Sequence, residues 1–88
     1  MTKEQQIYKN MKRPGHIKKA YGKWCISYSK LIKAIIDTGY SRDTADKIIE
    51  NMLARGYIRE SRNINGKTAT EQGLKHSLSG YIITKWIN

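Results

Sequence analysis

The sequence predicts one small α+β domain in which two helices joined by a tight turn precede a β-hairpin. Three observations support this fold class. Apolar residues recur at helical spacing through residues 28–56, and Asn65-Gly66 is a strong signal for a two-residue hairpin turn. The 88 residues, 39% of them apolar, suffice for a single hydrophobic core. We therefore treat residues 1–88 as one domain.

The N-terminal residues 1–13 are predicted to form a helix. Thr2 and Gln5 have the spacing of a capping box, and Pro14-Gly15 ends the pattern. Its apolar stripe consists of Ile7, Tyr8 and Met11.

Residues 14–23 are predicted to form a basic loop, because they combine one Pro, two Gly and poor periodicity; at most one helical turn is expected near residues 17–21. His16 and Tyr21 are interleaved with its lysines. Residues 24–27 are read as a short strand, and we expect Trp24 to lie in the core, as large aromatic residues of small domains usually do.

The helix pair spans residues 28–56. Ser27 or Ser29 caps the first helix, Gly39-Tyr40 makes the turn, and Ser41 caps the second helix. Gly56 ends the second helix as its C′ residue. The residues predicted to face the core are Leu31, Ile32, Ile35, Ile36, Ala45, Ile48, Ile49, Met52 and Leu53.

The last third is predicted as a hairpin over residues 57–70 and a helix over residues 71–87. The hairpin pivots on Asn65-Gly66, with strands at 57–63 and 67–70. A strand near 81–87, with Gly80 as the break, is the alternative to the helix. The helical spacing would place Leu74, Leu78, Tyr81, Ile82 and Trp86 on one face. That face would either pair with a second copy, giving a homodimer, or pack back across the domain.

Two stretches carry a family resemblance. Residues 41–58 combine a capping Ser, a Thr three residues later, an apolar helix face and a Gly-Tyr-Ile exit, while residues 68–74 look like a second wing strand and the helix after it. Together they resemble the winged helix-turn-helix family of DNA-binding domains, over about two thirds of the chain. The resemblance implies this fold, with an added N-terminal helix, basic arm and C-terminal helix. It also implies binding of double-stranded DNA as a small transcriptional regulator.

The resemblance also implies site residues. The helix over residues 41–55 would enter the major groove, where Arg42 and Lys47 read guanine or hold phosphate and Asn51 pairs with adenine. Further DNA contacts are expected from Ser41 on this helix and from Arg59, Arg62 and Lys67 on the wing. Asp43, Asp46 and Glu50 depart from this expectation, because they leave the recognition helix without net positive charge.

The distribution of charge keeps two alternatives open. The net charge is +10, and residues 1–30 hold eight basic residues against one acid, Glu4. An RNA-binding or ribosome-associated protein would use the basic segment, which contains Lys12, Arg13, Lys18, Lys19 and Lys23. A protein-interaction adaptor in a replication or transcription complex would use the acidic helix face and the apolar C-terminus.

Other classes are disfavoured. Cys25 is the only cysteine and the two histidines are isolated, so we expect no metal site and no cofactor. Gly66-Lys67-Thr68 lacks the upstream glycine of a phosphate-binding loop, and no catalytic dyad or triad is recognisable, so we expect no enzyme. No signal peptide or membrane-spanning run is found in the sequence, and we expect a cytoplasmic protein with no membrane partner.

Overall fold

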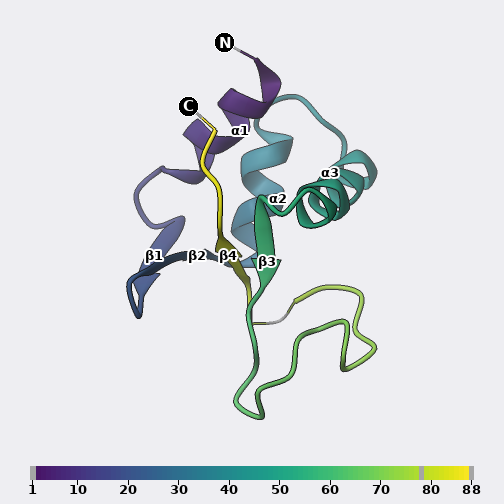
Figure 1. Ribbon diagram of the computed structural model, residues 1–88. Helices are drawn as coiled ribbons and strands as arrows, with labels where there is room; N and C mark the ends of the chain where they lie inside the picture. Colours follow the sequence, from purple (N-terminus) through teal and green to yellow (C-terminus); the bar gives the residue numbers. More distant parts are fainter. Residues whose placement is uncertain (1, 78, 88) are drawn as a thin grey trace.

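The computed structural model describes residues 2–77 and 79–87, which form a small α+β domain (Figure 1). Met1, Leu78 and Asn88 lie outside the described residues, and so does the predicted position of Leu78 on the face of a C-terminal helix. The elements within these ranges are α1 (Lys3–Met11), β1 (Ile17–Ala20), β2 (Lys23–Ile26), α2 (Tyr28–Ile36), α3 (Arg42–Ala54), β3 (Ile58–Glu60) and β4 (Tyr81–Ile83). The strands form one antiparallel sheet in the order β1-β2-β4-β3.

Helix α1 is confirmed, including its cap. The Gln5 amide donates to Thr2 Oγ1 at 3.1 Å, and the Thr2 amide donates to Gln5 Oε1 at 2.8 Å, which completes the capping box. Asn10 is buried on the same helix and donates through Nδ2 to the Ala34 carbonyl at 3.1 Å. In a longer helix the Thr38 amide would donate to this carbonyl. Here the Thr38 amide donates to the Ile35 carbonyl instead. Asn10 therefore satisfies an end group of α2 and joins the two helices.

The predicted basic loop is wrong: residues 17–26 form a β-hairpin, with no helical turn near residues 17–21. Its two-residue turn is Tyr21-Gly22, with φ of 51° and 77°. Positive φ at both positions is typical of the turn that matches strand twist in tight hairpins. The predicted strand at Trp24 is confirmed as β2. Trp24 itself is not in the core, because 38% of its surface is exposed.

The helix pair is confirmed. Ser27 caps α2 and Ser41 caps α3, each accepting a hydrogen bond from the backbone amide three residues on. Gly56 follows α3 with φ of 75°. The Tyr57 amide then donates to the Met52 carbonyl at 2.9 Å, the bond expected of a glycine-terminated helix.

The predicted wing is only partly correct. The chain does reverse near Asn65-Gly66, but over three residues, 64–66, rather than two: the Asn63 amide donates to the Lys67 carbonyl at 2.8 Å, and only Gly66 has positive φ, of 78°. Residues 67–70 are not a strand, however, and β3 pairs with β4. The predicted C-terminal helix is wrong as well, since the structure places no helix within 71–77 or 79–87. The alternative holds, and residues 81–83 form the strand β4.

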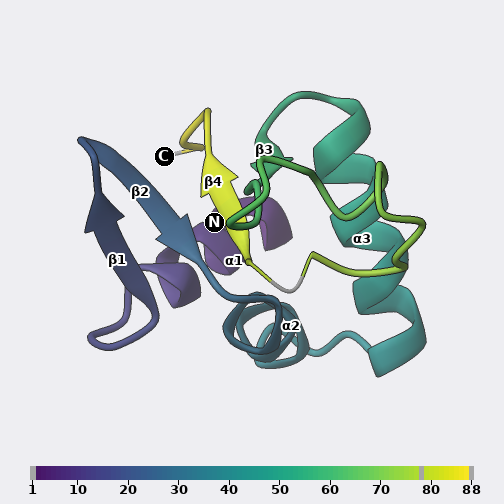
Figure 2. The ribbon, with the colours of Figure 1, turned by 90° about the horizontal axis from the view of Figure 1, so that it is seen from below.

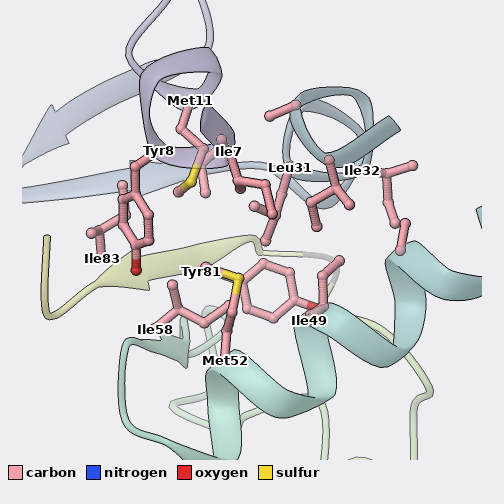
Figure 3. Close-up of a cluster of buried hydrophobic side chains, with 14 residues drawn as sticks. Ile7, Tyr8, Met11, Leu31, Ile32, Ile49, Met52, Ile58, Tyr81 and Ile83 are labelled. Carbon is pink, nitrogen blue, oxygen red and sulfur yellow. The ribbon is translucent and has the colours of Figure 1, made fainter. Parts of the chain in front are cut away.

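The core lies between the three helices and one face of the sheet (Figure 3). Alternation along the strands sends Ile26, Ile58, Tyr81 and Ile83 to the helix side, where all four are buried. The helices contribute Ile7, Tyr8, Met11, Leu31, Ile32, Ala34, Ile35, Ala45, Ile49 and Met52. Of the predicted core residues, Ile48 and Leu53 pack at its edge and Ile36 is exposed. Trp86 packs edge-on against Tyr8 at 5.7 Å, so the apolar C-terminus folds back onto the domain.

None of the helices within the described residues has the length and apolar character needed to cross a membrane.

The strained turn gives a stability prediction. Tyr21 is fully exposed and holds a left-handed backbone conformation that asparagine adopts more readily. We expect Tyr21→Asn to raise the free energy of unfolding by about 1 kcal/mol, measured by urea denaturation. Gly22→Ala, which introduces the same strain one residue later, should lower it. An unchanged or lower stability of Tyr21→Asn would contradict this account of the turn.

The Tyr8 hydroxyl gives a second prediction. It is buried and has no hydrogen-bond partner among the described residues. Burial, and then the charges of Tyr57 and Glu4, raise the pKa of Tyr8 from 10.0 to about 12. Between these values the unfolded chain ionises first, so stability is full below pH 10 and falls as the pH rises towards 12.

We expect Tyr8→Phe to be at least as stable as the wild type near neutral pH, because it removes an unsatisfied polar group. Above pH 10 the free energy of unfolding of the wild type should fall by up to roughly 2 kcal/mol more than that of Tyr8→Phe. Chemical denaturation at pH 8 and across the alkaline range measures both effects. Parallel profiles for the two proteins would show that Tyr8 is not the titrating group.

Candidate nucleic-acid interface

Helix α3 presents a mixed stripe to solvent rather than a basic one. Asp43, Lys47 and Glu50 are exposed and follow one another at spacings of four and three residues, so they share one face. Asn51 is exposed beside this stripe and lines a cavity of about 180 Å³ between α1 and α3. Ser41 is committed to the helix cap, where its hydroxyl also lies 3.0 Å from Thr44 Oγ1. The outward stripe therefore has two acids and one base.

Asp46, the third carboxylate of the helix, points to a neighbouring tyrosine instead. The Tyr28 hydroxyl, at the start of α2, donates a short hydrogen bond to Asp46 Oδ1. Burial, and then this bond to the carboxylate, raise the pKa of Tyr28. Asp46 therefore keeps its negative charge but is held by Tyr28, while Asp43 and Glu50 lie on the exposed stripe of α3.

Arg42 is held over the same tyrosine. Its guanidinium donates to the Tyr28 hydroxyl at 3.4 Å and lies 5.6 Å from the centre of the ring. This hydrogen bond is the main reason why the pKa of Arg42 is raised. The arginine remains exposed, so its positive charge faces solvent at the N-terminal end of α3.

The long segment between β3 and β4, which we call loop 61–80 and of which the structure describes residues 61–77 and 79–80, contacts this cluster. The His76 ring stacks on Tyr28 with centroids 4.0 Å apart and planes 20° apart. The neck of the loop is closed by the Ser61 amide, which donates to the Gly80 carbonyl at 3.0 Å. His76 of loop 61–80 and Asp46 of α3 therefore contact the same side chain, Tyr28. Figure 2 shows the segment between β3 and β4 running beside α3.

Internal hydrogen bonds give loop 61–80 its shape. Arg62 donates to the Gly66 carbonyl at 2.8 Å and forms an exposed ion pair with Glu71 at 3.3 Å. Glu60, at the end of β3, accepts from the Thr70 hydroxyl at 2.9 Å. Ala69 is buried beneath these contacts. Arg62 is thus partly neutralised, whereas the Lys67 side chain is exposed near the turn.

The other predicted site residues lie elsewhere. Figure 2 shows the β1–β2 hairpin on the opposite side of the molecule from α3, so Lys18, Lys19 and Lys23 do not join the surface of Arg42. Lys12 lies over the Trp86 ring at 5.0 Å. Arg13 pairs with Asp37 at 2.6 Å, joining the end of α1 to the end of α2.

Two further placements differ from the sequence prediction. Arg59 lies on a strand, as predicted, but this strand, β3, pairs with β4 opposite Ile82 rather than with residues 67–70. His16 was expected among the lysines of the basic loop. It is half-buried, and both of its ring nitrogens are buried and without hydrogen-bond partners among the described residues.

Sequence reasoning missed Tyr28 and His76 as members of the site. Tyr28 directly follows the capping Ser27 and lies outside the apolar stripe of its helix, which is a weak signal for a surface role. His76 gives no signal, because its contact depends on the course of loop 61–80. No cluster of three His, Cys, Asp or Glu side chains suited to a metal is found in the part of the chain that the structure describes.

The Tyr28 cluster yields a testable consequence. Tyr28→Phe keeps the ring that stacks on His76 but removes the donor to Asp46. We expect the free energy of unfolding to fall by about 1–2 kcal/mol in urea denaturation, because a charged acceptor loses its partner. Asp46→Asn retains an acceptor and should lose less. Equal stabilities of wild type and Tyr28→Phe would show that this hydrogen bond does not stabilise the site.

Comparison with known proteins adds no relative. No protein-family model, no curated protein and no solved structure matches the chain. The geometry of α3, Tyr28 and loop 61–80 is therefore the basis on which a function can be assigned.

Proposed function

We propose that the protein binds double-stranded DNA and acts as a small transcriptional regulator. The observation that carries the proposal is the attachment of α3 and loop 61–80 to one side chain, Tyr28, which makes a helix and a projecting loop into one surface. A helix that enters the major groove beside a loop that reaches the backbone is a recurring way of binding a duplex.

The order of the elements supports this proposal. Apart from β1, the chain forms a helix (α1), a strand (β2), a helix pair (α2 and α3) and then two strands (β3 and β4) separated by a long loop. We interpret the sheet neighbours β2-β4-β3 as the sheet of a winged helix-turn-helix, in which loop 61–80 would be the wing. In this interpretation β1 is an additional edge strand.

The charges determine how the duplex would lie. Arg42 at the start of α3 and Lys67 on loop 61–80 would hold phosphates, while the outward stripe of α3 lies over base edges. There Lys47 would contact guanine, and Asp43 or Glu50 would accept from the amino group of cytosine. Asn51, further along α3, would pair with adenine. This placement keeps the two carboxylates away from the phosphate backbone.

The proposal assigns binding and no catalytic role. The predicted alternatives, an RNA-binding protein and a protein-interaction adaptor, stay predictions. A dimer through a C-terminal helix is not proposed, since residues 81–83 are a strand inside the sheet.

Fluorescence anisotropy with a labelled duplex over a range of salt concentrations tests the proposal. Lys67→Ala should weaken binding to all duplexes alike and reduce the slope of log K against log salt by about 1, as expected for one lost phosphate contact. Lys47→Ala and Asn51→Ala should weaken binding to selected sequences, by about 1–3 kcal/mol for a base contact.

Lys9→Ala is the matched control. Lys9 is an exposed lysine on α1, away from loop 61–80 (Figure 1), and its removal changes the net charge equally. Duplex binding that is insensitive to Lys47→Ala and Lys67→Ala, or equally sensitive to Lys9→Ala, would overturn the proposed interface.

A further inference from the structure

One face of the sheet is not packed against the helices. The register aligns Lys18, Cys25, Ile82 and Arg59 in a row across all four strands. Residues aligned in this way point to the same side of a sheet, and their neighbours Ile26, Tyr81 and Ile58 are buried on the other side. Lys18 and Arg59 are exposed, while Cys25 and Ile82 are half-buried between them. We call this row, together with Lys23, the open face.

The charged side chains of the open face are all basic. Lys23 lies two residues before Cys25 on β2 and therefore on the same side as Lys18 and Arg59. The sequence holds no Asp or Glu between residues 5 and 36 or after residue 71, so β1, β2 and β4 contain none. The carboxylate of Glu60 on β3 belongs to the opposite side and accepts from Thr70. A surface of this charge is complementary to a polyanion.

The hairpin that extends this face ends in an aromatic ring. Tyr21 is fully exposed, and its left-handed backbone conformation has a conformational cost that no packing of the ring offsets. Trp24, which is 38% exposed, lies opposite Lys19, whose Nζ is 5.8 Å from the centre of its ring; alternation along β2 directs both side chains away from the open face, so Tyr21 at the tip is the ring available to this face. Rings displayed among lysines stack on bases, and such stacking requires bases that are unpaired.

We propose that the open face and the hairpin tip bind single-stranded nucleic acid, separately from the duplex site on α3. Phosphates would contact Lys18, Lys23 and Arg59, and a base would stack on Tyr21. The row crosses four strands, about 15 Å at the usual spacing of paired strands, so Lys18 and Arg59 lie at its two ends. An anionic peptide would use the same lysines but would gain nothing from the ring.

The test uses a labelled deoxythymidine oligomer of about ten nucleotides, followed by fluorescence anisotropy. Tyr21→Asn is the decisive variant, because it relieves the strained turn and removes the ring. We expect its thermal midpoint to rise while its affinity for the oligomer falls by at least about fivefold, the lower range for loss of one stacked base. Because the thermal midpoint should rise while the affinity falls, a loss of binding cannot be attributed to a loss of folding. Unchanged affinity would overturn the proposal.

A charge-matched pair of double variants tests the phosphate contacts. Lys18→Gln with Lys23→Gln should weaken binding and reduce the salt slope by about 1.4, the value for two contacts to a single strand. Lys9→Gln with Lys33→Gln alters exposed lysines of α1 and α2 by the same net charge and should have no more than a small effect. Equal losses in the two pairs would show nonspecific attraction and overturn the site.

Two further outcomes are informative about the partner. If Tyr21→Asn weakens binding of a duplex as much as that of the oligomer, the hairpin belongs to a duplex site and the single-strand proposal fails. If polyglutamate displaces the oligomer equally from wild type and Tyr21→Asn, the face is a general polyanion site and the proposal also fails. Retained duplex binding with lost oligomer binding supports two separate surfaces.

Discussion

The insertion of β4 into the middle of the sheet is the constraint on which the rest of the structure depends. The chain leaves the sheet after β3, runs through loop 61–80 and returns between β2 and β3. At the return point Gly80 has φ of 88°, and a Cβ there would lie 2.7 Å from the Ile26 carbonyl oxygen, so only glycine fits. The next residue, Tyr81, is among the largest fully buried side chains and contacts the core. This single return closes the sheet, completes the core and fixes both ends of the loop that lies beside α3.

The helices were predictable from the sequence because each has local signals at both ends. Thr2, Ser27 and Ser41 cap their helices, Gly56 ends the third, and helical spacing identifies most of the core. The strands β1 and β4 were not predictable in the same way. β1 is an edge strand rich in lysine, and its Tyr21-Gly22 turn lacks the usual asparagine. β4 has only three residues within an apolar run, and the apolar residues on both sides of Gly80 keep helical spacing, which predicted a helix. The left-handed backbone of Gly80 prevents that helix.

The candidate site was predictable in composition but not in arrangement. Arg42 and Lys67 were identified from the resemblance; Arg42 lies on the expected helix, α3, whereas Lys67 lies in loop 61–80 and not on a second wing strand. The partners that set the electrostatics of the site come from tertiary structure: Tyr28 reaches Arg42 through the packing of α2 and α3, and Glu71 reaches Arg62 through the path of loop 61–80. The basic segment was interpreted as a flexible arm, whereas strand pairing makes it a hairpin at the far side of the sheet from α3 (Figure 2). The excess positive charge is consequently divided between two surfaces rather than concentrated on the helix pair.

Amide chemical-shift mapping of the isotope-labelled protein is the most direct test of DNA binding by α3 and loop 61–80. A short duplex would be titrated into the protein at moderate salt, and the shifted amides would be placed on the structure. Our account predicts the largest shifts in residues 41–51 and 62–76, with α1 largely unaffected. Shifts confined to residues 17–26, or no shifts at saturating duplex, would contradict it.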